Sequence, residues 1–304
     1  MNLQHLRYLL SVAQTGSFTR AAAQMYVTQP AISSGIAQLE AELGVKLFNR
    51  SGRPELTIEG RTLVNYARQI QDLAEEAGDR LRKRESLRGQ GFQFGAVDTA
   101  VVYLLPEILR TYLAEHPDAE LSVQVSPSRD LAEDLLSNRS EFALITMPIE
   151  HPRLTIIPLY RDKLILVAGS SHAFAKRKSV TLQQVVEERL ILFDEESVSR
   201  RIVDEKFVEA GVSPRVVMTM RSPEAMRKLA EAGVGISFLP YLSVETALKS
   251  GDLKQVHVKG VHLSREIGLA WKKGRYFGPA ILGLISAIVS KFGKSALFEK
   301  VRQG

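Results

Sequence analysis

The side chains best suited to chemistry form a polar group near residue 30. Gln29, Ser33 and Ser34 fall on one face of an expected helix, opposite a row of apolar residues. A glutamine can bind adenine through two hydrogen bonds, the ring of Pro30 can contact a thymine methyl group, and hydroxyl groups can reach phosphates or base edges. This pattern predicts a helix whose N-terminal residues read bases in the major groove of DNA.

Two arginines follow in a short polar segment, residues 49–54. Arg50 and Arg53 lie between two β-like runs, where we expect them to contact phosphates or the adjacent minor groove. Each polar residue taken alone also fits the solvated face of a surface helix. Their combination with a capped helix, a basic wing and a long linker favours DNA binding.

Three helices and a wing are expected to position these residues. The first helix has apolar residues at three- and four-residue intervals and ends at Gly16. Ser17 caps a second helix that stops near Val27, and Thr28 starts a third that closes at Gly44. The buried stripe of the third helix consists of Ile32, Ile36, Leu39 and Leu43, and the wing strands are expected at Val45–Leu47 and around Leu56 and Ile58. The prediction is a winged helix-turn-helix over residues 1–58.

A long helix is expected from Thr57 onward. Its apolar positions recur at alternating intervals of four and three residues, which favours a two-stranded coiled-coil seam. These positions are Leu63, Ala67, Ile70, Ala74, Ala77 and Leu81. The alternative is an amphipathic helix that lies on its own domain. We predict a linker and dimerisation helix over residues 59–88.

The first part of the chain resembles the LysR-type transcriptional regulators. The resemblance rests on SFTRAAAQMYVTQPAISSGIAQLEAELGVKLFNR and GRPELTIEG, and covers about the first 65 residues, while the length near 300 and the linker helix also agree. It implies DNA contacts from Gln29, Pro30, Ser33 and Arg53, with Thr28 and Arg50 supporting at the DNA backbone. Two positions depart from the family pattern: Ser34 stands where an arginine is frequent, and Gly35 where a larger residue is usual. Loss of an arginine removes a common guanine reader, so base specificity there is open.

The remaining residues, 89–304, alternate short β-like runs with helical patterns. This order predicts mostly parallel α/β structure with helices outside the sheets. The expected strands are 92–97, 121–125, 142–145, 164–168, 190–193, 216–220, 236–239 and 267–271. The family resemblance implies two α/β lobes like those of a periplasmic binding protein, with a ligand between them. We place the first lobe at 91–160 and 266–304 and the second at 161–265, joined by two crossover strands.

Polar residues at the expected strand ends are the candidates for ligand binding. Ligands of open α/β sheets bind beyond the carboxyl ends of strands, near helix N-termini. The candidates are Thr99, Ser126, Ser128, Thr146, Ser197, Ser199 and Ser222. Their hydroxyl groups and the free helix amides suit a small anionic metabolite. Ser222 precedes Pro223 and equally fits a helix cap.

Composition disfavours catalysis and metal binding. The chain has no cysteine, its 6 histidines show no metal-ligand spacing, and no dinucleotide, phosphate-loop or serine-hydrolase motif is present. We therefore expect neither an enzyme nor a cofactor or metal, apart from the small-molecule effector.

The partners expected are operator DNA, further copies of the chain as a dimer and a tetramer, the effector, and RNA polymerase. A net charge of +6 favours a polyanionic partner. No apolar run reaches the length of a membrane span and no signal peptide is apparent, so we expect a cytoplasmic location with no membrane partner. The alternative hypothesis is a solute-binding module that lacks sequence-specific DNA binding.

Overall fold

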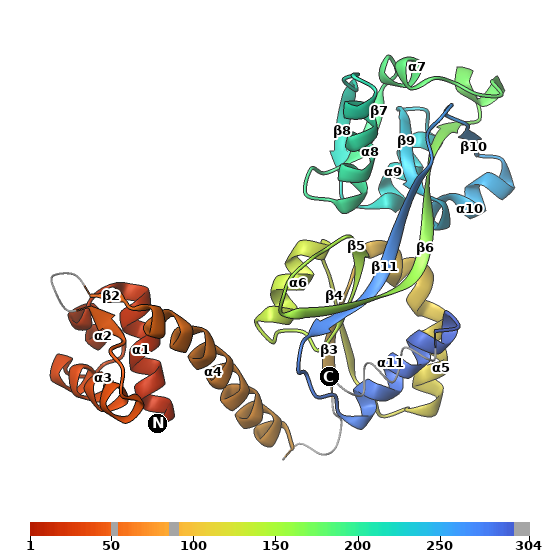
Figure 1. The fold of residues 1–304 in the computed structure, drawn as a ribbon. Coiled ribbons are helices and arrows are strands. Elements are labelled where there is room, and N and C mark those ends of the chain that lie inside the picture. The colour runs from red at the N-terminus through yellow and green to blue at the C-terminus, as the bar shows by residue number, and fades with distance from the viewer. Residues whose placement is uncertain (50–53, 85–90, 295–304) are drawn as a thin grey trace. The chain divides into compact units, whose positions relative to one another are not determined.

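The chain divides into two units, Met1–Leu87 and Arg88–Gly304 (Figure 1). The computed structural model describes residues 1–49, 54–84 and 91–294. Each unit has its own hydrophobic core, and we describe them separately.

The N-terminal unit is a three-helix bundle with a small wing and a long helix. Its elements are α1 (Leu3–Thr15), α2 (Phe18–Gln24), α3 (Gln29–Leu43), β1 (Phe48–Asn49), β2 (Glu55–Leu56) and α4 (Ile58–Arg84). Gly16 ends α1 in the left-handed conformation, and the Ser17 side chain caps α2 by accepting from the Arg20 amide. The expected helices are confirmed, but the prediction that Leu43 belongs to the buried stripe of α3 is wrong, because this residue is 41% exposed at the end of the helix.

The wing strands differ from the prediction. The antiparallel pair forms between Phe48–Asn49 and Glu55–Leu56, one or more residues later than Val45–Leu47. Residues 45–47 instead form no strand and follow the turn that ends α3. Ile58 belongs to α4, because the Thr57 hydroxyl accepts from the Gly60 amide at 2.9 Å and caps that helix.

The apolar stripe of α4 is partly used within the chain. Ala67 is fully buried and Val64 nearly so in the core formed with α1, and Leu63 and Ile70 pack against that core. The buried Ala67 is therefore no part of a dimer seam, contrary to the prediction. Leu63 and Ile70 are half-buried against their own domain, and the rest of the seam stays a prediction. Ala74 is half-buried, and the side chains of Ala77 and Leu81 lie outside the described residues.

The C-terminal unit consists of two α/β lobes joined by two long strands, β6 (Leu154–Gly169) and β11 (Leu263–Lys272) (Figure 1). The first lobe contains β3 (Phe92–Ala96), η1 (Ala100–Leu104), α5 (Leu105–Glu115), β4 (Leu121–Val125), α6 (Ser128–Leu136), β5 (Ala143–Met147) and α11 (Pro279–Lys291). The second contains η2 (Ala173–Lys176), α7 (Leu182–Val186), β7 (Leu190–Phe193), α8 (Val198–Glu209), β8 (Val216–Met220), α9 (Pro223–Glu231), β9 (Ile236–Pro240), α10 (Tyr241–Ser250) and β10 (Leu253–Val256).

One sheet runs through both lobes. Its strand order is β4-β3-β5-β11-β6-β9-β7-β8, with β10 paired to β6. β3 pairs in parallel with β4 and β5, and β7 pairs in parallel with β8 and β9. β6 and β11 are antiparallel to each other, β11 is antiparallel to β5, and β6 is antiparallel to β9. The two-lobed α/β prediction is confirmed, and the parallel strands of both lobes direct their carboxyl ends toward the region between the lobes.

Candidate functional site

The N-terminus of α3 presents the polar residues expected to meet DNA. Thr28, Gln29 and Pro30 are exposed, and Thr28 is an N-cap residue with extended backbone whose side chain forms no cap hydrogen bond. Ser34 is also exposed and Ser33 is half-buried. The first turn therefore offers polar side chains that can reach phosphates and base edges, whereas Pro30 has no amide hydrogen and the Ala31 amide already donates to the Thr28 carbonyl oxygen.

The opposite face of α3 is fixed by the core. Ile32, Ile36 and Leu39 have no exposed surface. A Cβ atom at Gly35 would lie 2.7 Å from Cδ2 of Tyr8, so the glycine permits the close approach of α1. The departure from the family pattern at Gly35 thus has a packing cause, one that sequence reasoning missed.

The turn before α3 carries a residue that sequence reasoning did not single out. Tyr26 has φ of +56° and is 97% exposed. A non-glycine residue in this conformation is uncommon, and here the turn between α2 and α3 imposes it. The aromatic ring stands next to the proposed DNA-contacting residues Thr28 and Gln29 in sequence.

The wing is anchored by a buried carboxylate. Oε1 of Glu40 accepts from the amides of Leu47 at 2.9 Å and Phe48 at 3.4 Å, and Oε2 accepts from Nζ of Lys46 at 3.1 Å. Glu40 therefore ties the end of α3 to the first wing strand. Arg50 and Arg53 lie outside the described residues, so their contacts stay predictions.

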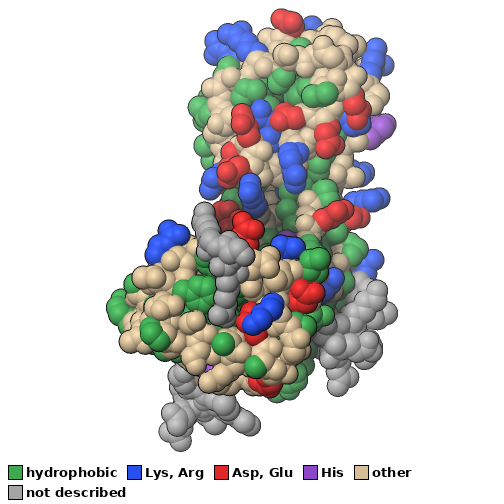
Figure 2. Space-filling view, turned by 60° about the vertical axis from the view of Figure 1, so that its left-hand side comes forward, with side chains coloured by type: hydrophobic (Ala, Val, Ile, Leu, Met, Phe, Trp, Pro, Cys, Tyr) green, Lys and Arg blue, Asp and Glu red, His purple; other side chains and the backbone are tan. Residues whose placement is uncertain are grey.

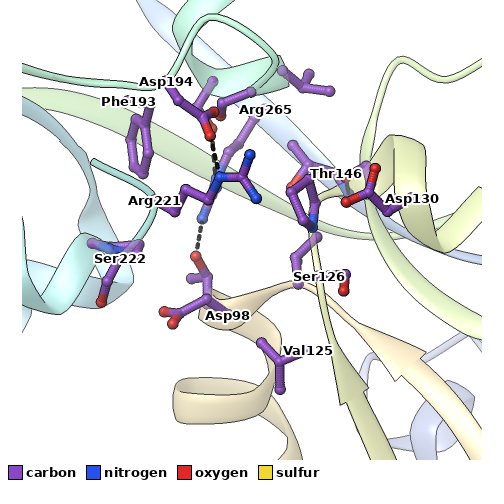
Figure 3. A pocket seen from close by; sticks show the side chains of 18 residues that line it. Asp98, Val125, Ser126, Asp130, Thr146, Phe193, Asp194, Arg221, Ser222 and Arg265 are labelled. Carbon is purple, nitrogen blue, oxygen red and sulfur yellow. Dashed lines mark hydrogen bonds and ion pairs between the residues drawn. The ribbon is translucent and has the colours of Figure 1, made fainter. Parts of the chain in front are cut away.

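A cavity of about 260 Å³ lies between the two lobes of the C-terminal unit. All seven effector candidates line it: Thr99, Ser126, Ser128, Thr146, Ser197, Ser199 and Ser222. Figure 3 shows second-lobe side chains (Phe193, Asp194, Arg221, Ser222) on one side and first-lobe side chains (Asp98, Val125, Ser126, Asp130, Thr146) on the other. The structure thus brings together residues that are far apart in sequence; that they bind a ligand stays a prediction.

Three helices begin at this cavity. They are α6, α8 and α9, and their first or preceding residues Ser128, Ser197 and Ser222 line it. Ser222 caps α9 through the Ala225 amide at 3.5 Å, as the cap interpretation of that residue predicted. Neither α6 nor α8 has a side-chain cap, so of these three described helices two present unpaired N-terminal amides to the cavity.

The most buried charged residue in the cavity lining is one that sequence reasoning missed. Arg265, on β11, is 5% exposed and directly opposite Asp162 on β6. Its Nη1 donates to Ser199 Oγ at 3.1 Å in the second lobe, and its Nη2 donates to Thr99 Oγ1 at 2.9 Å in the first. The same Nη2 lies 3.3 Å from Oδ2 of Asp162. One guanidinium group therefore links both lobes.

Burial dominates the ionisation of this pair. It raises the pKa of Asp162, although the positive charge and hydrogen bond of Arg265 oppose the effect, and it lowers the pKa of Arg265. Nε of Arg265 has no hydrogen-bond partner among the described residues. The interlobe region thus holds a buried donor without a partner among the described residues, which costs free energy in the folded chain.

A second arginine, Arg221, follows β8 on the second-lobe side. It donates to Asp194 at 2.6 Å and to Glu196 at 3.4 Å. A further arginine at the start of α8, Arg200, is buried and bonded to Asp204 and to the Phe193 carbonyl oxygen. The sequence did not mark Asp162 and Arg265 as buried, because both are flanked by polar or charged residues, in Arg161-Asp162-Lys163 and Ser264-Arg265-Glu266.

Acidic and basic side chains are intermixed on the visible face of the second lobe (Figure 2).

Among the described residues no group of three or more histidine, aspartate or glutamate side chains is arranged to hold a metal ion. Within the same residues, no helix is long and apolar enough to span a bilayer.

The comparisons with known proteins cover both units. A family model described as "Bacterial regulatory helix-turn-helix protein, lysR family" matches residues 3–61, and one described as "LysR substrate binding domain" matches residues 86–293. A "Probable RuBisCO transcriptional regulator" of Trichormus variabilis is 30% identical, over 95% of this chain and 88% of its own length. The protein of the same description from Cyanophora paradoxa is 29% identical, over 96% and 92%.

Solved structures agree with this assignment. Full-length CbnR complexed with its target DNA has a TM-score of 0.54 and 26% identity, covering 96% of this chain and 99% of its own. A full-length OxyR variant from Pseudomonas aeruginosa has a TM-score of 0.58 at 24% identity, covering 95% and 99%, and supports the fold.

The winged helix-turn-helix and the two-lobed domain define a DNA-binding transcriptional regulator with an effector-binding domain. The chain belongs to the LysR family. Its relatives are regulators and not enzymes, and the match of the DNA-binding model disfavours a solute-binding module without DNA binding.

Proposed function

We propose that this regulator reads operator DNA with the N-terminus of α3 and responds to a small metabolite held between its two lobes. The observation that carries the proposal is the exposed polar first turn of α3 on a buried apolar stripe. Gln29 and Pro30 contact bases, joined by Ser33 and the exposed Ser34, while Thr28 and Arg50 hold the DNA backbone and Arg53 extends the contact from the wing. CbnR, crystallised with its target DNA, has the same fold.

The DNA contact is tested by Gln29→Ala with Gln38→Ala as a matched control. Both residues are exposed glutamines on α3, but Gln38 is farther from the N-terminus. Loss of a base-reading glutamine costs about 1–3 kcal/mol, which is roughly a five- to 150-fold loss of affinity. We expect Gln29→Ala to show this loss for the DNA upstream of its own gene, measured by fluorescence anisotropy, and Gln38→Ala to bind as the parent does. Equal affinity in both variants would refute the assigned contact.

Symmetric operators require paired copies of the chain. The part of α4 beyond Ile70 carries the remaining apolar positions, and Ala74 is half-buried there. We assign this part to a dimer seam, with two dimers forming a tetramer that bends the DNA between neighbouring sites. Ala74→Glu places a like charge from each copy in the seam, so we expect dissociation in analytical ultracentrifugation, whereas an unchanged oligomer places the interface elsewhere.

The effector acts by differential affinity for two arrangements of the lobes. The seven hydroxyl residues around the cavity bind it, and Arg265 already links both sides. Ligand binding then shifts the population of arrangements and alters access of RNA polymerase to the promoter in the cytoplasm.

A further inference from the structure

The cavity lining contains more aspartates than arginines, which does not favour a ligand that carries only negative charge. Three aspartates line it, Asp98, Asp130 and Asp194, against two arginines, Arg221 and Arg265. Both arginines are already paired with carboxylates, Arg221 with Asp194 and Arg265 with the adjacent Asp162. Asp98 and Asp130 form no ion pair or hydrogen bond with another side chain of the described residues.

The central part of the cavity still suits a negative group. The uncapped N-termini of α6 and α8 open there, and Arg265, whose side chain is 4% exposed, has an Nε without a partner among the described residues. A ligand carboxylate at this point accepts hydrogen bonds from hydroxyl and amide donors of both lobes.

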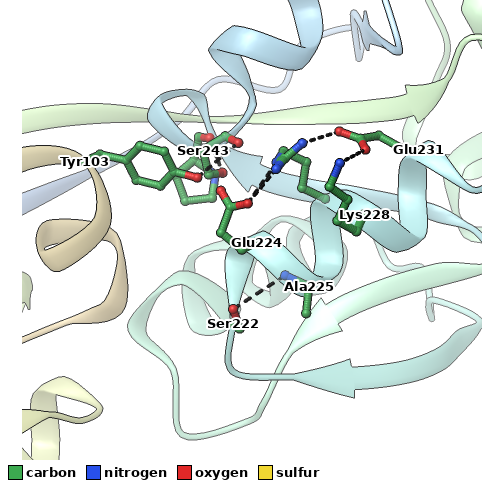
Figure 4. A network of polar contacts seen from close by, with 9 residues as sticks. Tyr103, Ser222, Glu224, Ala225, Lys228, Glu231 and Ser243 are labelled. Atoms are coloured by element: carbon green, nitrogen blue, oxygen red, sulfur yellow. Dashed lines mark hydrogen bonds and ion pairs between the residues drawn. The ribbon is translucent and has the colours of Figure 1, made fainter.

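The first-lobe wall has the opposite character. Asp98 follows β3 and is half-buried, and its Oδ1 is buried without a hydrogen-bond partner in the described chain. Burial, followed by the nearby charge of Glu224, raises the pKa of Asp98, while the positive charge of Arg265 opposes this effect. Glu224 and Glu231, which are labelled in Figure 4, both form ion pairs with Arg227, so this arginine does not neutralise Asp98.

Helix geometry accounts for part of the negative charge on this wall. Asp130 lies in the first turn of α6, and Asp98 lies in the first turn of the helical stretch that begins after Val97, so both carboxylates can stabilise a helix through its dipole. Hydrogen bonding does not account for Asp98, because its Oδ1 is buried without a partner among the described residues. A cation or hydrogen-bond donor supplied by a ligand would relieve the cost of that buried oxygen atom.

From these contacts we infer that the effector is a small zwitterion of the amino-acid class, with its carboxylate at Arg265 and the starts of α6 and α8 and its ammonium group at Asp98. The inference rests on the proposed effector function of this cavity and specifies its ligand. The volume of about 260 Å³ lies just below the usual range for drug-sized ligands, which agrees with a single small metabolite.

The test compares matched ligands on the full-length chain. Each of the twenty standard L-amino acids is measured by thermal shift and calorimetry beside its 2-oxo acid, which lacks the ammonium group, and its amine, which lacks the carboxylate. We expect at least one amino acid to bind and both of its matched compounds to bind about tenfold more weakly or worse, since each loses a charged hydrogen-bond partner. Binding of no amino acid, or equal binding of an oxo acid, overturns the inference.

Two variants locate the ammonium group. Asp98→Asn should weaken the amino acid about tenfold or more but leave the 2-oxo acid unaffected, since only the former meets the carboxylate. Glu133→Gln, an exposed carboxylate on α6 outside the cavity lining, should change neither affinity. If Asp98→Asn binds the amino acid as the parent does, the assignment of Asp98 is wrong.

Failure of this inference and failure of the proposed function give different results. Operator binding is recorded in parallel with and without each compound. If oxo acids or other anions bind and change operator affinity, the regulator function stands and the zwitterion is refuted. If compounds bind but Ser126→Ala and Asp98→Asn change none of their affinities, the cavity is not the effector site, and the part of the proposed function that places the effector between the lobes fails.

Discussion

At the scale of residues, the crossover strands place a buried and an exposed ion pair side by side. Arg265 lies opposite Asp162 and its neighbour Glu266 lies opposite Arg161. The first pair is almost entirely buried, whereas the side chains of the second are 73% and 36% exposed. Successive residues of a strand face opposite sides of the sheet, so β6 and β11 hold one ion pair that is buried and a neighbouring ion pair that is exposed to solvent.

These neighbouring pairs make a matched experiment. Asp162→Asn leaves the buried Arg265 without its carboxylate, and removal of one partner from a buried pair costs about 3–5 kcal/mol. Glu266→Gln breaks the exposed pair, for which about 0–1 kcal/mol is expected. Urea unfolding of both variants measures the difference, and equal losses would show that burial does not decide the contribution of these pairs.

A second residue-scale prediction concerns Asp98 and pH. Its pKa lies above the ordinary 3.8, so the folded protein holds a proton at Asp98 more tightly than the unfolded chain does. The stability that follows is fully present below the unfolded pKa and is lost as pH rises through the folded pKa. Without ligand, Asp98→Asn should therefore be more stable than the parent at pH ~7, with the gain vanishing toward pH ~4. Chemical unfolding across this range checks it, and a pH-independent difference would contradict it.

The seven cavity hydroxyls could be predicted because strand ends are visible in sequence and the carboxyl ends of parallel strands meet. Arg265 could not be placed this way. Its environment depends on the pairing of β11 with β6, about 100 residues away, and on the register that sets it opposite Asp162. The acidic character of the first-lobe wall depends on which arginines are already paired, a property of the folded chain alone.

At the scale of elements, the crossing of α1 and α3 depends on one missing side chain. Gly35 lies inside α3, where glycine normally costs about 1 kcal/mol relative to alanine. The nearest atoms to an added Cβ belong to Tyr8 and His5, at 2.7 Å and 3.1 Å. The close contact between the helices therefore offsets the lower helix propensity.

We expect Gly35→Ala to destabilise the N-terminal unit by about 1–3 kcal/mol, because overpacking outweighs the gain in helix propensity. Ala37→Gly, at an exposed position of the same helix, should cost about 1 kcal/mol from propensity alone. Thermal unfolding monitored by circular dichroism distinguishes them. A Gly35→Ala variant that gains stability would show that Tyr8 moves aside without cost.

The wing and α4 show where local patterns stop being informative. The pattern correctly predicts a long helix that starts near Thr57 and Ile58, but it also places Ile58 in a strand, since a β pair of two residues has too little pattern to fix its ends. In α4 the heptad spacing continues through residues that pack on α1 and residues that do not. Periodicity identifies an apolar stripe but not its partner.

At the scale of the whole molecule, two units with separate cores should unfold separately. We expect two calorimetric transitions, of which an effector raises only that of Arg88–Gly304. At 100 times its dissociation constant the ligand should add about 2.7 kcal/mol to that unit. The Gly35→Ala variant should shift only the other transition, and a single transition that moves with either change would contradict independent units.

The two crossover strands have a consequence for how such proteins diversify. The chain enters the second lobe along β6 and returns along β11, and these strands pair side by side through the middle of the sheet. Everything between them is thus an insertion with adjacent ends, which can be exchanged as a cassette while the first lobe and its core remain intact. A chimera carrying a relative's second lobe would inherit the ligand contacts of that lobe alone, so new chemical specificities can be assembled by recombination at two points.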